Sequence, residues 1–329
     1  MTASVDPVEA HAAATVIDGT NPSVYDRTLL ERLRAGGVTA VNATVAIVEG
    51  FARTVALIRR WEHFIETNGD LAIQVRSVDD IAAAKAQGKL GILFGLQNTA
   101  AIEEELDLLS ALRDAGVRVM QLTYNERSLV GDGCFERVDA GLTRFGVNVV
   151  KRMNDEGVLI DLSHVGDVST RDAIELSEKP VAITHSSPRA LFDYPRNKPD
   201  DLIRLLADKG GVFGCTFWPF FLKNGMGSTL ADYVDTIDYA VGVAGIDHVS
   251  IASDFFLNRS KEELQRLRAG RSRDWRAIAL EWPVVYPEGI AAPEEYPNIT
   301  AELLRRGYSA EEAAKIMGGN LVRLFNLVW

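Results

Sequence analysis

Eight short apolar segments, most of them rich in β-branched residues, recur along this chain, and this repetition restricts the possible folds more than any other feature. The segments are 16–18, 37–46, 90–98, 117–125, 158–164, 180–186, 210–217 and 248–255. Most are almost continuously apolar, which is typical of parallel strands covered on both faces. Stretches with helical periodicity lie between them, at 76–89, 101–116, 143–157, 199–210 and 230–245. The alternation predicts an α/β fold, a (β/α)8 TIM barrel of the metal-dependent hydrolase type.

The same pattern predicts one domain. No linker rich in proline, glycine or serine interrupts it, so we expect a single barrel domain over 1–329. The charged segment 257–298, which contains Trp275, Trp282 and Tyr286, departs from the pattern. We expect this segment to be an irregular loop insertion above the end of the last strand, where such loops often cover an active site.

The two ends of the sequence carry different signals. The segment 309–328 is expected to form a C-terminal helix that packs on the outside of the barrel, and Ser309 with Glu312 has the spacing of a capping box at its start. The first 15 residues contain early acidic residues, with no Lys/Arg cluster and no apolar run. That composition argues against a signal peptide.

Composition excludes several classes of partner. The net charge is −11 with a pI near 5.1, which argues against a nucleic-acid or anionic-membrane partner because both favour clustered Lys and Arg. Two cysteines, Cys134 and Cys215, cannot form a disulfide framework. No apolar run approaches the length of a membrane span. We therefore expect a cytoplasmic protein that acts on a small molecule.

The residues at the predicted strand ends carry the chemistry. Active sites of such barrels lie where the strands end. The polar residues there are Thr20, Asn42, Gln97, Asn98, Tyr124, Asn125, His164, His185, Thr216 and Asp254. Two histidines on consecutive strands and an aspartate suit Zn²⁺ or a similar ion, and an aspartate beside a bound water can act as base and then as acid. A mononuclear metal site and two merely hydrogen-bonding histidines both stay open at this point.

Three further residues have two interpretations each. Tyr124 is either a rim aromatic or an O–H donor to a developing oxyanion. Arg196 is either a surface arginine or a bidentate anchor for a substrate carboxylate. Cys134 lies in a glycine-rich loop without a histidine partner nearby in sequence, which favours a structural role over a reactive one.

The motifs that hold these residues resemble those of the membrane (renal) dipeptidase family, peptidase family M19, whose members are zinc peptidases with an amidohydrolase-like barrel. The motifs are VLIDLSHV at 158–165, PVAITHSSPRAL at 180–191, PRNKPDD at 195–201 and HVSIASDF at 248–255. The likeness continues through 116–125, 141–146 and 317–325. It therefore extends over nearly the whole chain.

The resemblance implies a two-metal site. One family metal is held by the His and Asp of a DGHxD motif after the first strand and by a bridging Glu on the third. The other is held by that Glu and by the histidines that end strands five and six, which correspond to His164 and His185. Arg196 would bind the substrate carboxylate, with Asn197 beside it in the motif, and Asp254 would hold the attacking water and transfer its proton.

This chain departs from the family pattern mainly at the first metal. DGHxD is DGTNP here, so Thr20 and Pro22 replace two ligands, and Gln97 replaces the bridging Glu. Tyr124 stands where the family has a His that polarises the scissile carbonyl. We therefore expect a divergent member that lacks the first-metal ligands.

One divalent metal, Zn²⁺, is expected in place of two. His164 and His185 would hold it, the carbonyl oxygen of Gln97 would be a weaker ligand, and Asp254 is a further candidate ligand. Thr20 and Asn21, in the turn that lost its metal ligands, are expected to bind substrate, as is Asn125.

Three functions are consistent with this set of residues. The first is a metal-dependent hydrolase that cleaves an amide-like C–N bond in a small substrate bearing a carboxylate. The second is a lyase, isomerase or dehydratase in which Asp254 and the histidines transfer protons without a binuclear site. The third is a non-catalytic protein that binds a small molecule. The resemblance also implies a homodimer.

Overall fold

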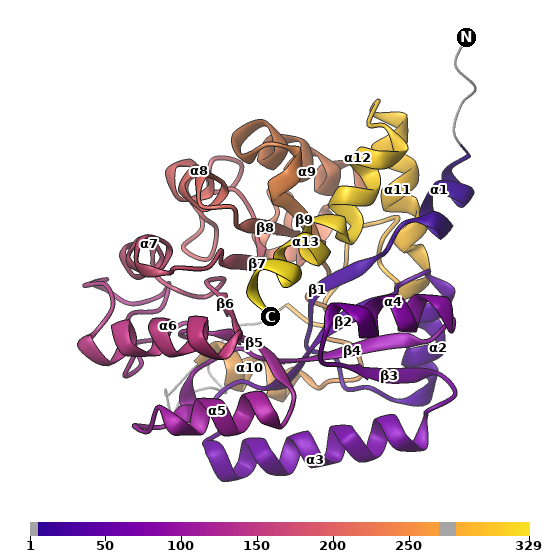
Figure 1. Cartoon of the computed structure of the whole chain (residues 1–329). Helices are drawn as coiled ribbons and strands as arrows, with labels where there is room; N and C mark the ends of the chain where they lie inside the picture. Colours follow the sequence, from indigo (N-terminus) through magenta and orange to yellow (C-terminus); the bar gives the residue numbers. More distant parts are fainter. Residues whose placement is uncertain (1–5, 270–280) are drawn as a thin grey trace.

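The computed structural model describes residues 6–269 and 281–329, and Trp275 of the predicted insertion lies outside them. Eight parallel strands form a nearly closed barrel, as the sequence predicts (Figure 1). In sheet order they are β1 (Ile17–Asn21), β2 (Ala40–Ala46), β4 (Leu90–Leu96), β5 (Val117–Gln121), β6 (Leu159–Asp161), β7 (Ala182–Ser186), β8 (Val212–Thr216) and β9 (Val249–Ala252). Across the seam between β1 and β9, the Asp254 N–H donates to the Thr20 carbonyl over 2.9 Å.

One further strand, β3 (Ala72–Val75), was not predicted. It pairs in parallel with the first half of β4, from Ala72 opposite Leu90 to Val75 opposite Leu93. The second half of the same β4 edge pairs with β5. At four residues β3 is too short to show a strand periodicity, and it lies outside the path of the eight barrel strands.

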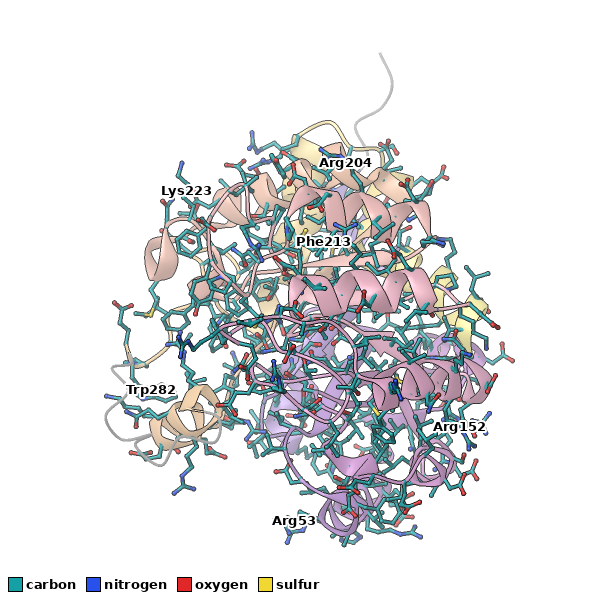
Figure 2. The ribbon with its side chains drawn as sticks, turned by 90° about the vertical axis from the view of Figure 1, so that its left-hand side faces the viewer. Arg53, Arg152, Arg204, Phe213, Lys223 and Trp282 are labelled. Atoms are coloured by element: carbon teal, nitrogen blue, oxygen red, sulfur yellow. The ribbon has the colours of Figure 1, made fainter. Side chains whose placement is uncertain are left out.

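Helices surround the barrel on its outer side, except for α10, which lies over the ends of the strands (Figure 1). They are α1 (Pro7–Ala13), α2 (Arg27–Ala35), α3 (Phe51–Thr67), α4 (Val78–Ala86), α5 (Asp107–Asp114), α6 (Arg144–Glu156), α7 (Asp167–Leu176), α8 (Asp200–Asp208), α9 (Leu230–Ala244), α10 (Lys261–Ala269) and α11 (Tyr296–Arg305), with short helical turns η1 (Ala100–Ile102), η2 (Pro219–Phe221), η3 (Gly225–Gly227), η4 (Ile246–His248) and η6 (Pro293–Glu295). Figure 2 shows Arg53 and Lys223 at the periphery, whereas Phe213 lies inside and is fully buried. Within the described residues, no helix has both the length and the apolarity needed to cross a bilayer.

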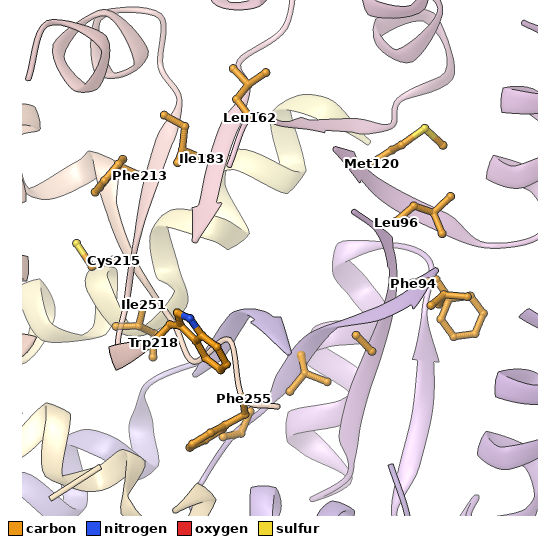
Figure 3. Close-up of a cluster of buried hydrophobic side chains, with 14 of the residues drawn as sticks. Phe94, Leu96, Met120, Leu162, Ile183, Phe213, Cys215, Trp218, Ile251 and Phe255 are labelled. Atoms are coloured by element: carbon orange, nitrogen blue, oxygen red, sulfur yellow. The ribbon is translucent and has the colours of Figure 1, made fainter. Parts of the chain in front are cut away.

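Alternation along each strand divides the core into two layers. Outward-facing side chains pack between the sheet and the helices, and Figure 3 shows part of this layer around Phe94, Met120 and Phe213. Inward-facing side chains fill the N-terminal half of the barrel, namely Ile17, Ala40, Val75, Leu93, Val119, Leu159, Ala182 and Val212. Because the barrel interior is packed at this end, the open end is the one where the strands terminate.

The C-terminal segment differs from its prediction. The capping box of Ser309 and Glu312 is present, but the segment is divided into α12 (Ala310–Ala314), a π-helical turn η7 (Lys315–Gly319) and α13 (Asn320–Val328). The break occurs at Gly318, which lies so close to the Thr15 carbonyl that a Cβ atom there would be 2.3 Å from its oxygen.

The helix α13 also does not pack on the outside as expected. Its apolar side chains Leu321, Leu324, Phe325 and Val328 belong to the inner layer of the barrel. They close the N-terminal end, because the inward-facing strand residues would otherwise be exposed to water there. Figure 1 shows α13 across the ends of the strands.

The predicted insertion is partly helical rather than irregular. Residues Lys261–Ala269 form α10, with Glu262 and Glu263 in its first turn and Arg266 and Arg268 in its last, an order that complements the helix dipole. From residue 281 the described chain is largely irregular up to η6 and α11.

Candidate active site

A cavity of about 290 Å³ opens where the barrel strands end. The predicted site residues that line it are Gln97, Tyr124, Asn125, His164, Arg196 and Asp254. Aromatic side chains form much of the remaining wall, namely Phe135, Tyr194, Trp218, Phe221 and Phe256. Helix α10 adds Leu264, Leu267 and Arg268, so the segment expected to cover the site does contribute to its wall.

His164 and His185 meet at the ends of β6 and β7. Their Nε2 atoms are 3.2 Å apart, whereas His164 Nδ1 is 2.7 Å from Asn125 Oδ1 and His185 Nδ1 is 2.8 Å from Thr184 Oγ1. Both rings are buried. Burial, and the nearby charge of Arg196, hold the pKa of each imidazole well below its ordinary value of 6.5. The pair is therefore neutral at pH 7, the form in which imidazole binds a metal ion.

Tyr124 stacks on the ring of His164. The ring centroids are 4.2 Å apart and the planes are inclined by 24°. Burial raises the pKa of the Tyr124 phenol, and the nearby Asp254 raises it further. The hydroxyl therefore keeps its proton at neutral pH and is available as a hydrogen-bond donor.

Asp254 follows β9 in a backbone conformation that disfavours most residues. Its φ is +51°, and this left-handed conformation is held by the hydrogen bond from Asp254 N–H to the Thr20 carbonyl and by the Tyr286 hydroxyl, which donates to the Asp254 carbonyl over 3.3 Å. Burial raises the pKa of its carboxyl to about 7, and Asp18 and Asp161 add to the effect while Arg196 opposes it. A carboxyl with this pKa exchanges protons readily near neutral pH.

Arg196 lies under the cavity rather than on the surface, and its side chain is fully buried. Its Nη2 donates to the His185 carbonyl over 2.7 Å, and its Nη1 donates to the Ser163 carbonyl. Its Nε has no hydrogen-bond partner among the described residues, and the guanidinium lies 5.1 Å from the Phe221 ring centroid. Arg196 thus fixes the ends of two strands and retains N–H groups for another acceptor.

Thr20, Asn21 and Asn197 are not among the residues that line the cavity. Thr20 Oγ1 lies 3.1 Å from Thr184 Oγ1, and Asn21 Nδ2 donates to Asp18 Oδ2 over 3.0 Å. Asn197 Nδ2 donates to the carbonyls of Phe192 and Phe221. Their substrate-binding roles stay predictions, while the structure gives each of these side chains a partner within the protein.

Buried acids that the sequence interpretation did not assign to the site support it from behind. Asp161 accepts from the Ser163 and Thr184 hydroxyls, and Asp18 accepts from the Ser253 N–H and hydroxyl. A signal was present, because Asp161 interrupts an otherwise apolar segment and Asp18 directly follows Val16 and Ile17, and a carboxylate buried at such a position requires donors around it.

The two metal positions of the family differ in how well these residues fit them. The first does not fit, because Thr20 is bonded to Thr184 and Pro22 has no side-chain donor. At the second, the separation of 3.2 Å between two histidine Nε2 atoms suits two bonds of about 2.1 Å to one small cation. Gln97, which lines the cavity, donates from its side-chain Nε2 to Thr44 Oγ1 over 2.7 Å. This bond uses the amide nitrogen and not the amide oxygen. Within the described residues, no three His, Cys, Asp or Glu side chains converge as a metal cluster.

Known proteins similar to this chain point to one family. The family model described as membrane dipeptidase (peptidase family M19) matches residues 15–267 and 277–328. Dipeptidase 3 of Rattus norvegicus is 29% identical over 246 residues, which are 73% of this chain and 45% of that protein, so this chain spans about half the length of that curated relative.

Solved structures agree with this match. An amidohydrolase from Pseudomonas aeruginosa is 40% identical, with a TM-score of 0.94 and 99% of each chain covered. A metallo peptidase from Rhodobacter sphaeroides, liganded with a phosphinate mimic of the dipeptide L-Ala-D-Ala, has a TM-score of 0.81 at 19% identity over 96% of this chain and 99% of that one, which shows a shared fold. Because the family model matches most of its length, this chain belongs to the membrane dipeptidase family, peptidase family M19.

Proposed function

We propose that this protein hydrolyses an amide or peptide-like C–N bond in a small substrate that carries a carboxylate, with one divalent cation, Zn²⁺, at the active site. Membership of the family supports a hydrolase of this bond type. The names of two similar proteins, an amidohydrolase and a dipeptidase, agree with it. A cavity of about 290 Å³ lies at the lower end of the usual range for ligand sites, which favours a small substrate.

The observation that carries the proposal is the approach of two neutral histidines at the ends of β6 and β7, where His164 lines the cavity and His185 lies buried next to it. The Nε2 atoms of His164 and His185 face each other at 3.2 Å. Tyr124 and Asp254, which supply a hydrogen-bond donor and a proton acceptor, line the same cavity as His164. This combination provides a cation site, a base and an oxyanion donor within reach of one small substrate.

Each side chain then has a distinct task. His164 and His185, with the Gln97 oxygen as a weaker ligand, would hold the cation, which would supply Lewis-acid polarisation of the scissile carbonyl. The Asp254 carboxylate accepts a proton from the attacking water as the C–O bond forms, and returns it to the leaving nitrogen as the C–N bond breaks. The Tyr124 hydroxyl donates to the oxyanion.

Arg196 is the proposed anchor for the substrate carboxylate. Two of its nitrogens hold the carbonyls of Ser163 and His185, so the guanidinium is immobile before a substrate arrives. An immobile cation loses little conformational entropy on binding. It also lies at the strand ends that carry both histidines, which sets the distance between the substrate carboxylate and the reacting bond.

The proposal is tested by metal content and turnover together. Protein purified without chelator is expected to hold close to one equivalent of Zn²⁺ by elemental analysis and to hydrolyse members of a panel of dipeptides and N-acyl amino acids. His164→Ala should lose both the metal and the activity, whereas Asp254→Asn should lose activity and keep the metal. His63→Ala, which removes an exposed histidine on α3, is the control and should change neither. Full activity in metal-free protein would contradict the proposal.

A second candidate follows from the ligand count. Two histidines are fewer than the three protein ligands usual in a catalytic zinc site. A lyase or isomerase would use Asp254, whose carboxyl pKa is about 7, for proton transfer alone. Such a reaction would not require a third protein ligand to a metal. Turnover of a carboxylate substrate that survives exhaustive chelation, and is lost in Asp254→Asn, would favour this reaction over hydrolysis.

A further inference from the structure

A group of buried hydroxyl side chains surrounds the Nδ1 atom of His185. The Thr184 hydroxyl is at its centre, with Thr184 Oγ1 2.8 Å from both Asp161 Oδ2 and His185 Nδ1. Thr20 Oγ1 lies 3.1 Å from the same oxygen, and Ser163 Oγ, whose proton goes to Asp161 Oδ1 at 2.5 Å, lies 3.2 Å from it. All of these side chains are buried. Since unpaired polar atoms are costly to bury, each proton in this group can be assigned to a contact.

The proton of Thr184 belongs to the Asp161 contact. Burial raises the pKa of the Asp161 carboxyl, and hydrogen bonds from Ser163 and Thr184 oppose that shift. Asp161 Oδ1 accepts from the Ser163 N–H at 3.0 Å, the Ser163 hydroxyl at 2.5 Å and the Thr184 N–H at 3.0 Å, a set of donors that an ionised carboxylate satisfies as an acceptor. A bond from hydroxyl to carboxylate is charge-assisted and stronger than one from hydroxyl to neutral imidazole. Thr184 has one proton and two lone pairs, so His185 Nδ1 must donate its N–H to Thr184 Oγ1.

The same reasoning applies to His164. Its Nδ1 faces Asn125 Oδ1 at 2.7 Å, an oxygen that can only accept, so Nδ1 carries the proton. Both Nε2 atoms are then without protons, and their lone pairs face one another across 3.2 Å. Two lone pairs in this position repel each other unless a cation, either a metal ion or a proton, lies between them.

We infer that Asp161 and Thr184 are positioning residues of the cation site, which hold His185 as its Nδ1–H tautomer and so keep its Nε2 free as a ligand. The inference rests on the proposed function, since it assigns these residues to the same cation. It also gives Thr20 a role, because the second lone pair of Thr184 accepts the Thr20 hydroxyl. The residue that replaces a first-metal ligand of the family thus helps to orient a ligand of the second metal.

Thr184→Val tests the inference, because it removes the hydroxyl and keeps the shape of the side chain. The ¹⁵N signals of the histidine rings are recorded in chelator-treated protein, with assignment through single-histidine substitutions, and Zn²⁺ affinity is measured by competition with a chromophoric chelator. Wild-type His185 should show the Nδ1–H tautomer. Thr184→Val should lose it and bind Zn²⁺ roughly 10- to 100-fold more weakly.

Two further variants separate this role from general packing. Thr20→Val should shift the His185 signals and the Zn²⁺ affinity in the same direction by a smaller factor. It replaces Thr184→Val as the test variant if Thr184→Val does not fold. Thr236→Val, at a buried threonine of α9 outside the group, should change neither. A wild-type His185 in the Nε2–H tautomer, or tautomer and affinity unchanged in Thr184→Val, overturns the inference. Wild-type protein that binds no Zn²⁺ contradicts the proposed function instead, and the tautomer signals still decide the role of Thr184.

Discussion

Asp254→Asn should abolish turnover and also stabilise the protein near neutral pH. The substitution removes the negative charge and changes little else. Asparagine adopts left-handed backbone conformations as readily as aspartate, so the φ of +51° adds no new strain. What disappears is the free energy needed to keep this carboxylate ionised, because burial raises its pKa most and Asp18 and Asp161 raise it further.

The magnitude follows from the pKa of Asp254, which burial raises from 3.8 to about 7. At 1.36 kcal/mol per unit, ionised Asp254 costs the folded state up to about 4 kcal/mol. A raised carboxyl pKa means that the folded protein holds the proton more tightly, so the contribution of Asp254 to wild-type stability is greatest below pH 3.8 and is lost as the pH rises through 7. The advantage of the variant should therefore be about 4 kcal/mol at pH 8 and roughly 1.6 kcal/mol at pH 5. Contact between this side chain and water in the cavity makes both values upper bounds.

Urea denaturation of both proteins at pH 5 and pH 8, in chelator, measures the difference. With an unfolding entropy of about 2.1 cal/mol/K per residue, the gain at pH 8 corresponds to roughly 6 °C in Tm. Asp193→Asn, at an exposed aspartate, is the control and should show no gain at either pH. A variant no more stable than wild type at pH 8, or a gain that does not change with pH, would refute the electrostatic reasoning.

Three other outcomes can be checked directly. Turnover (kcat/KM) between pH 5 and 9 should fall about tenfold per unit below pH 7, because protonated Asp254 cannot accept a proton; a flat profile would exclude it as the base. Tyr124→Phe should lower kcat by roughly 100-fold and leave KM almost unchanged, as steady-state kinetics would show for a donor used only in the transition state. Gly318→Ala should lower the free energy of unfolding, measured in urea, by about 1–3 kcal/mol, because its Cβ would lie 2.3 Å from the Thr15 oxygen. A variant as stable as the wild type would show that the kink can relax.

Much of the architecture was predictable from periodicity. Continuous apolar segments separated by helical patterns indicate parallel strands with helical crossovers, and all eight barrel strands lie where those segments occur. Parallel strands bring their C-terminal ends to one rim, so the sequence also identified the residues of that rim, and Tyr124, His164 and Asp254 do line one cavity.

The direction of each rim side chain depended on neighbours from distant parts of the sequence. Thr20 and Asn21 end the strand that was expected to face the substrate, yet Thr20 meets Thr184 across the barrel and Asn21 turns back to Asp18. The helix α13 fills the opposite end of the barrel for a similar reason, since its apolar face matches inward-facing residues contributed by many strands.

The barrel and the order of its strands were predictable from the sequence, because the hydrophobic period is a local property of the chain. That His164 and His185 face each other through Nε2, with Asp161 and Thr184 behind His185, is visible only in the folded structure. Ring orientation depends on which donors and acceptors the closing barrel brings next to each nitrogen, and these come from strands far apart in the sequence.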